Sequence, residues 1–225
     1  DTILCANKFH TREFENYCFS NKKIKLINLG YPKIDELNKK QISQIPNKKI
    51  QNILIAPTWG NEKENFPVYE KLINMLLNHN FKIKFRPHPV TIDKRVNILG
   101  RMEKIFTNNS DFSISYEKNN LNDYLWSDTI ISDWSGSAIE YSLATKKPCI
   151  FLNTEQKVRN KNAKSYEKDN SFENYFRNNI GLCIEKENIS DVLINLNKNT
   201  FLNLSEEKID DFRLNYLYNF LNTQS

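Results

Sequence analysis

The sequence has 225 residues, of which 39% are hydrophobic and 26% charged, a composition that favours a folded domain with a packed core and argues against a disordered chain. The formal net charge is +5, with Lys and Arg spread along the chain. This balance suits an anionic ligand or an anionic membrane surface, and it is equally typical of an ordinary solvated surface. The longest apolar runs are far shorter than a membrane-spanning helix, so we expect no transmembrane segment.

The cysteines are scattered, with no pair at the spacing of a metal or redox motif, and they are Cys5, Cys18, Cys149 and Cys183. We therefore expect a reducing, cytoplasmic location with no disulfide framework and no metal site. No signal peptide opens the sequence, and its first residues are typical of a strand entered in mid-fold. We therefore expect the sequence to be part of a longer protein.

Short β-rich runs alternate with helical stretches, which predicts an α/β fold with a Rossmann-like parallel sheet flanked by helices. The expected strands are 2–6, 25–29, 50–56, 81–85, 112–116, 129–132, 148–152 and 181–184. The expected helices, placed by apolar residues at helical spacing, are 66–79, 135–145, 189–196 and 206–221.

A polar stretch around residues 38–49, which contains Pro46, interrupts this alternation before a new strand. We predict that residues 1–45 are the end of an N-terminal α/β domain with an interdomain crossing. Residues 46–200 would form a Rossmann-like domain that binds a nucleotide-activated donor. Residues 201–225 would form a C-terminal helix that packs back toward the first domain.

The strongest local pattern is a buried strand, a tight polar turn, a helix and a second buried strand. The turn and its approach contain small or acidic residues, namely Ser132, Asp133, Ser135, Gly136 and Ser137. Small residues and free amides at a helix N-terminus favour phosphate, and in open α/β sheets ligands bind beyond the carboxyl ends of the strands. The pattern predicts a phosphate site here. The alternative is that Asp133 or Ser135 only caps the helix.

Glu140 follows the turn by about one helical turn, in a helix whose other residues are largely apolar. A carboxylate there is suited to accept hydrogen bonds from a ribose diol, so Glu140 is a candidate ribose-binding residue. The alternative is a glutamate that faces solvent.

Arg86 and His88 follow the strand 81–85 and alternate with Pro87 and Pro89. The prolines stiffen the turn, so a cation and an imidazole would be presented rigidly to a diphosphate. The alternative is a structural turn. Thr58 and Trp59 also end a strand and are weaker candidates for donor contacts.

Taken in order, these segments resemble the CDP-glycerol glycerophosphotransferase (teichoic acid glycerophosphate polymerase) family. The matching pieces are Gly30-Tyr31-Pro32 with Asp35, Ala56-Pro57-Thr58-Trp59, Arg86-Pro87-His88-Pro89, Ser132 to Glu140, and Lys147 to Phe151. The resemblance implies the donor-binding half of a GT-B fold. It also implies a catalytic and phosphate-binding role for His88, and a phosphate-binding role for Ser135, Gly136 and Ser137. Arg86 would support them and Asp133 would orient the loop.

The sequence departs from the family pattern at Glu140, where the family usually has Asp, and at Gly136, where it has Ser. The resemblance implies a transferase that uses CDP-glycerol or a related CDP-alditol to extend a surface polysaccharide or teichoic-acid-like polymer. The two departures leave open a GT-B glycosyltransferase with a nucleotide-sugar donor, and a non-catalytic nucleotide-binding scaffold is a third alternative.

The resemblance further implies partners and a place in the cell. The donor is a substrate, so we expect no separate cofactor. The acceptor would be a polymer or a lipid-linked molecule, handled at the inner face of the cell membrane with peripheral association, and the catalytic base would belong to an acceptor domain. Nucleic-acid binding is not expected, because aromatics such as Trp126, Trp134 and Tyr141 fall in core-like runs.

Overall fold

A six-stranded, entirely parallel sheet forms the centre of the molecule in a computed structural model that describes residues 1–16, 24–41, 49–60, 62–93, 97–117, 119–155, 171–197 and 199–218. Its strand order is β5-β4-β3-β6-β7-β8, and a separate parallel pair is formed by β1 and β2. The strands are β1 (Thr2–Cys5), β2 (Lys25–Asn28), β3 (Asn52–Ile55), β4 (Lys82–Phe85), β5 (Phe112–Ile114), β6 (Thr129–Ser132), β7 (Cys149–Asn153) and β8 (Leu182–Glu185).

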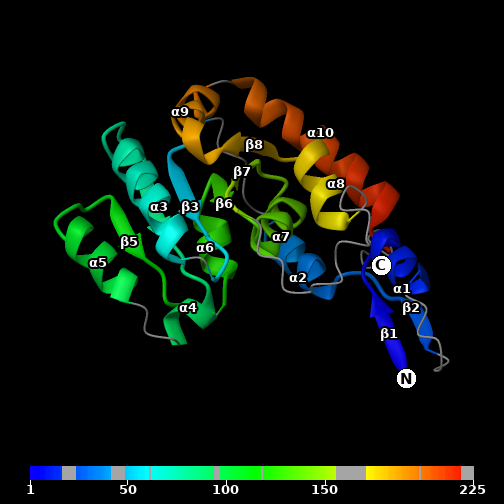
Figure 1. Cartoon of the computed structure of the whole chain (residues 1–225). Coiled ribbons are helices and arrows are strands. Elements are labelled where there is room, and N and C mark those ends of the chain that lie inside the picture. The colour runs from blue at the N-terminus through cyan, green and yellow to red at the C-terminus, as the bar shows by residue number, and fades with distance from the viewer. Residues whose placement is uncertain are drawn as a thin grey trace.

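Helices connect successive strands and cover both faces of the sheet (Figure 1). They are α1 (Lys8–Asn16), α2 (Pro32–Gln41), α3 (Glu62–Leu77), α4 (Pro89–Asp93), α5 (Asn97–Phe106), α6 (Leu121–Trp126), α7 (Gly136–Thr145), α8 (Phe172–Asn179), α9 (Ser190–Leu196) and α10 (Asn199–Tyr216), with a short 3-10 turn at Lys186–Asn188. Within these described ranges, no helix combines the length and the apolar character that a bilayer crossing requires.

Two hydrophobic layers hold the helices to the sheet, and the alternation of side chains along β3 explains both. Ile53 and Ile55 face the layer made with α3, α5 and α9, whereas Leu54 faces the layer made with α2, α6, α7, α8 and α10. All three side chains are fully buried. A strand covered on both faces is mostly apolar, which is why the middle residues of β3, β6 and β7 are all apolar, while polar residues occur only at the strand ends.

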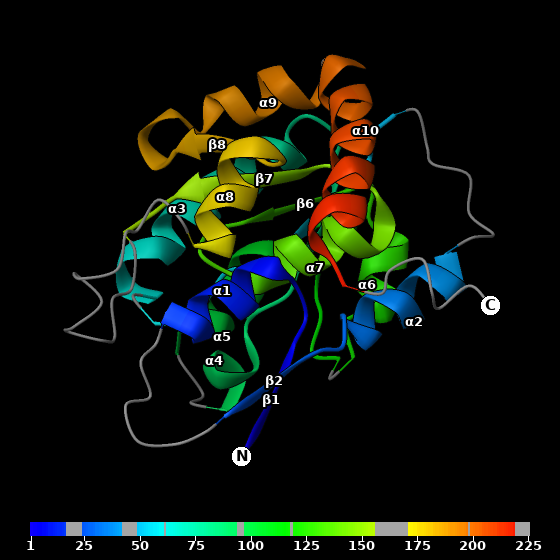
Figure 2. The same ribbon diagram turned by 90° about the vertical axis from the view of Figure 1, so that its right-hand side faces the viewer.

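The first and last described segments meet at one end of the molecule (Figure 2). The Tyr218 amide donates to the Ala6 carbonyl at 3.2 Å, and Asn7 forms an antiparallel bridge with Leu217. The aromatic rings of Phe9 and Phe212 stack at 6.5 Å between centroids. The final helix α10 therefore packs on the sheet through α7 and also reaches the β1–α1 unit. The domain boundaries at residues 45 and 200 stay predictions.

The expected Rossmann-like sheet is confirmed, and each of the eight expected strands occurs within two residues of its predicted ends. The last helix begins at Asn199, well before the predicted residue 206. Asn and Thr at its start have low helix propensity, so the local pattern gives no sign of the first two turns.

Candidate functional site

The ends of β3 and β6 lie side by side although they are far apart in the sequence, and the order of the sheet reverses between them. In a doubly wound sheet this reversal is where the connecting segments separate and a ligand binds. The Ser132 hydroxyl donates to the Ala56 carbonyl at 2.5 Å, and the Thr58 amide donates to Asp133 Oδ1 at 2.7 Å. Two of the predicted segments are thus fastened to each other at this point.

Residues 132–137, which run from the last residue of β6 into the first turn of α7, are called the serine loop below. Ser135 has an extended backbone (φ −118°, ψ 132°) and caps the helix by accepting the Ser137 amide at 3.3 Å. Gly136 is exposed, and a Cβ added to it would meet no atom within 4 Å. The loop therefore leaves open space directly beside the first amides of a ten-residue helix, whose dipole favours an anion.

Ser132 and Asp133 have no exposed surface, so they hold the serine loop from inside. Burial raises the pKa of the Asp133 carboxyl, and the Thr58 amide opposes this rise. Its second oxygen, Oδ2, has no hydrogen bond of good geometry among the described residues, and the buried Tyr69 hydroxyl nearby also opposes the rise of the pKa. The phosphate-binding role of these two residues stays a prediction, and their burial gives them a positioning role in the orientation of the loop.

Arg177, which the sequence analysis did not single out, supports the serine loop through contacts with its backbone and with Trp134. Its guanidinium donates to the Asp133 carbonyl at 2.5 Å and to Asn153 Oδ1 at 2.7 Å. The Cζ atom lies 3.9 Å from the ring centroid of Trp134 and 4.5 Å from that of Phe151, distances suited to cation–π attraction with each ring. The side chain is only 2% exposed, so it places a positive charge beneath the predicted phosphate site.

Glu140 lies one turn into α7, and residues at the start of α2 and just before it engage both of its oxygens. The Tyr31 hydroxyl donates to Oε1, and Lys33 Nζ donates to Oε2 at 2.5 Å. Burial raises the pKa of the Tyr31 phenol, and the Glu140 carboxylate raises it further. The Gly-Tyr-Pro segment and Glu140 of α7, which are far apart in the sequence, are therefore in direct contact.

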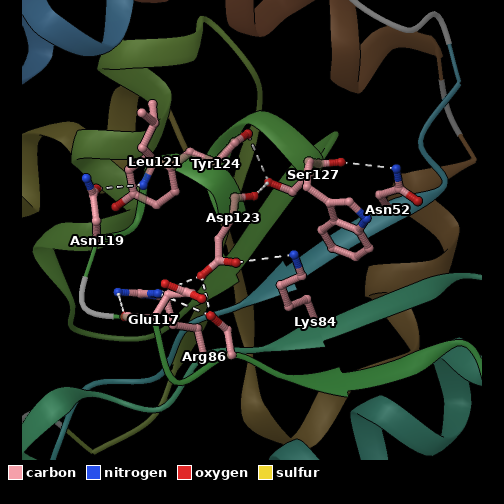
Figure 3. A network of polar contacts seen from close by, with 11 residues as sticks. Asn52, Lys84, Arg86, Glu117, Asn119, Leu121, Asp123, Tyr124 and Ser127 are labelled. Atoms are coloured by element: carbon pink, nitrogen blue, oxygen red, sulfur yellow. Dashed lines mark hydrogen bonds and ion pairs between the residues drawn. The ribbon is translucent and has the colours of Figure 1, made fainter.

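Arg86 takes part in a polar network at the carboxyl end of β4 (Figure 3). Its Nη1 lies 2.6 Å from Asp123 Oδ2, and its Nη2 donates to the Glu117 carbonyl at 2.8 Å. Asp123 also accepts the Ser115 hydroxyl at 2.6 Å, and Lys84 Nζ lies 3.2 Å from its Oδ1. These bonds fix the turn that carries His88. In the structure the Arg86 guanidinium binds Asp123 and the Glu117 carbonyl. A phosphate-binding role for Arg86 stays a prediction.

His88 lies on that turn, next to the segment that follows β3. Its Nδ1 accepts the Val90 amide at 3.2 Å, and its ring centroid is 6.1 Å from that of Trp59. Because Nδ1 accepts a hydrogen bond, the neutral ring carries its proton on Nε2. Trp59 follows Thr58, whose amide binds Asp133, so the turn after β4, the end of β3 and the serine loop form one continuous series of contacts.

Within the described ranges, no three His, Cys, Asp or Glu side chains gather in a way that would hold a metal ion. The groups described above, which are amides, hydroxyls and an imidazole next to a carboxylate, are suited to the recognition of an anion and a diol.

The fold is shared with several solved structures of low sequence identity. A Methanocaldococcus jannaschii UDP-GlcNAc 2-epimerase in complex with UDP-GlcNAc and UDP is 18% identical with a TM-score of 0.56, over 95% of this chain and 60% of that one. A glycosyltransferase from Rickettsia africae is 17% identical with a TM-score of 0.52, over 100% and 61%. The S. aureus MnaA–UDP co-structure is 12% identical with a TM-score of 0.57, over 89% and 52%. These likenesses confirm the expected GT-B-like fold.

The chain thus spans about three fifths of the length of the first two of these proteins. No curated protein matches it. A model of the CDP-Glycerol:Poly(glycerophosphate) glycerophosphotransferase family matches residues 1–214. This range includes every motif that the sequence shares with that family, from Gly30 to Phe151. The chain therefore belongs to the CDP-glycerol:poly(glycerophosphate) glycerophosphotransferase family of transferases.

Proposed function

We propose that the chain binds CDP-glycerol or a related CDP-alditol and forms the donor-binding part of a transferase that extends a surface polysaccharide or teichoic-acid-like polymer. The observation that carries the proposal is the open space at Gly136, at the N-terminus of α7 and at the point where the sheet order reverses. Family membership supports the choice of donor. Peripheral placement at the inner face of the cell membrane, where a lipid-linked acceptor would be reached, belongs to the same proposal.

The diphosphate would lie on the serine loop. The Gly136 amide and the hydroxyl groups of Ser135 and Ser137 are the donors that this helix start presents, since the Ser137 amide already donates to Ser135 Oγ, and the helix dipole adds attraction for negative charge. Arg177 contributes a buried positive charge beneath the loop, in a setting where water screens it poorly.

His88 would donate its Nε2 proton in a hydrogen bond to a phosphate oxygen of the donor. In the reaction, an acceptor hydroxyl oxygen attacks the phosphorus that carries the glycerol. A new P–O bond forms, the bond from that phosphorus to the bridging oxygen breaks, and CMP leaves with the electron pair. The acceptor proton passes to a base that we place in an acceptor-binding part of the protein.

A nucleotide-sugar donor is the second candidate, because Glu140 carries a longer side chain than the Asp of the family pattern. The S. aureus MnaA structure, which shares the fold, contains UDP. In that case the acceptor would attack an anomeric carbon and the nucleoside diphosphate would leave.

Calorimetric titration with CDP-glycerol, CDP, CMP and UDP separates these candidates. The proposal predicts saturable binding in which the cytidine nucleotides exceed UDP in affinity. Preference for UDP would favour the nucleotide-sugar candidate. Failure of the folded chain to bind any of the four would leave a non-catalytic scaffold as the remaining interpretation.

A further inference from the structure

The Glu140 carboxylate is held by two side chains that come from a different part of the sequence. Tyr31 and Lys33 flank Pro32, at the start of α2, and each donates to one carboxylate oxygen. Gly30, just before them, has a φ of 94°, which lets the chain turn sharply out of β2 toward α7. Glu140 is partly shielded, with 19% of its side chain exposed.

The frame that carries these two residues is packed firmly against α7. Ile34 and Leu37 of α2 are buried in the same core cluster as Leu143 of α7. Further along both helices, Arg213 donates to the Leu143 carbonyl at 2.7 Å and to Asn38 Oδ1 at 2.9 Å. The apolar packing between α2 and α7 and the hydrogen bonds of Arg213 to both helices therefore fix the start of α2 relative to Glu140.

The engaged carboxylate keeps capacity for a ligand. An ionised carboxylate offers about four lone-pair positions, and Tyr31 and Lys33 use two of them. Helical side chains lean toward the N-terminus of their helix, so the Glu140 carboxylate lies on the side of Gly136, four residues earlier. The unused lone pairs are thus near the predicted diphosphate site, where the ribose of a bound nucleotide would lie.

We propose that Tyr31 and Lys33 are positioning residues that fix the Glu140 carboxylate for the ribose hydroxyl groups of the donor nucleotide. This inference rests on the proposed function, because it presumes that a nucleotide binds at the serine loop. It differs from a purely structural clamp between α2 and α7, which would contribute to stability without any preference for ribose over deoxyribose.

The test compares binding of CDP and 2′-deoxy-CDP to the wild-type chain and to Tyr31→Phe, Lys33→Met and Glu140→Gln. Tyr31→Phe keeps the ring that packs against the core and removes only the hydroxyl. We expect the wild-type protein to prefer CDP by about tenfold, the size expected for a hydrogen bond to a charged group. Each of the three variants should lose most of that preference while its affinity for 2′-deoxy-CDP changes little.

A matched control is available at Tyr116, whose hydroxyl donates to Glu103 Oε1 at 2.5 Å on the exposed surface beyond β5, at the far edge of the sheet. Tyr116→Phe removes the same kind of hydrogen bond and should keep the wild-type preference for CDP. The inference is overturned if the wild-type protein binds both nucleotides equally, or if Tyr31→Phe keeps the full preference. Absence of CDP binding to the wild-type protein would instead overturn the proposed function.

Discussion

Asp133 and Arg177 show how single buried residues shape the site. The Asp133 carboxylate accepts the Thr58 amide and so joins the serine loop to the end of β3, and Arg177 donates to the Asp133 carbonyl. Both are almost completely buried, and burial lowers the pKa of the Arg177 guanidinium and raises that of the Asp133 carboxyl. Burying charge is costly unless it is well partnered, so these residues keep the loop in one conformation at the expense of stability.

Asp133→Asn should weaken the pH dependence of stability. The pKa of Asp133 is higher in the folded than in the unfolded protein, so the folded protein binds more protons in the window between the two values. The free energy of unfolding therefore falls as pH rises from about 4, the ordinary pKa of Asp, through the folded pKa. The variant, which has no proton to lose there, should show a shallower fall.

Urea unfolding of the two proteins at pH 4.5 and pH 7 measures this difference. Asp111→Asn, at an exposed position, is the control and should keep the wild-type dependence. An unchanged or steeper fall in Asp133→Asn would contradict the prediction.

Gly136→Ala should separate folding from binding. The added methyl group meets no atom of the protein, so the free energy of unfolding should stay within about 0.5 kcal/mol of the wild-type value. The same methyl group narrows the space proposed for the diphosphate, and because the family pattern has the small residue Ser at this position, the affinity for CDP-glycerol should fall by about threefold to tenfold. Calorimetric titration checks the affinity, and unchanged binding would place the donor elsewhere.

At the scale of elements, the strands could be predicted from the sequence, whereas several helices could not. A strand buried on both faces is a short apolar run between turn residues, and β6 was predicted with its exact ends as observed. The short helix α6 has two polar residues among its six, and α8 is rich in Asn and charged residues. Their helical state comes from tertiary contacts, such as the buried Tyr124 and Phe176, which local periodicity does not reveal.

The connection between α8 and β8 gives a prediction at this scale. A Cβ added to Gly181 would overlap the ring of Phe151 and lie 3.3 Å from Cys149 Sγ. Because Phe151 also forms one side of the Arg177 site, the ring has little freedom to move. Gly181→Ala should lower the free energy of unfolding by about 1–3 kcal/mol.

Gly100→Ala is the matched control, since Gly100 lies within α5 and an added Cβ meets no atom within 4 Å. It should be neutral or stabilise by about 0.5–1 kcal/mol, because Ala favours a helix over Gly. Equal urea midpoints for the two variants would argue against the crowding at Gly181.

Across the whole molecule, an aromatic cluster joins the beginning and the end of the chain to the sheet. Phe212 of α10 stacks on Tyr216 at 4.9 Å and meets the Phe176 ring edge-on at 5.4 Å. Phe9 of α1 lies 5.1 Å from Tyr175 of α8. Since α8 also carries Arg177, the serine loop is supported by helices that lie far from it in the sequence.

Phe212→Ala should therefore be strongly destabilising, by about 3–5 kcal/mol, because the side chain is 1% exposed and its removal leaves a cavity. Leu214→Ala on the same helix removes a 58% exposed side chain and should change stability by less than about 0.5 kcal/mol. Urea unfolding measures the loss of stability in both variants. A similarly small loss in Phe212→Ala and Leu214→Ala would show that the aromatic cluster does not stabilise the fold.

The candidate site was predictable from the sequence only in part. The serine loop and the His88 turn could be recognised because strand, turn and helix signals are local. The contacts of Glu140 with Tyr31, of Asp133 with Arg177 and of Arg86 with Asp123 join residues that are far apart in the sequence. No local pattern records such pairings, which arise only when the sheet brings the strand ends together.

The position of β3 between β4 and β6 has a consequence for how the protein is made. As the nascent polypeptide leaves the ribosome, β3 can pair with β4 first, but its other edge stays unpaired until β6 has also emerged. An unpaired apolar strand edge is prone to aggregate, and pairing over such a distance is slow. Synthesis that stalls before β6 would thus leave an intermediate that is prone to aggregate.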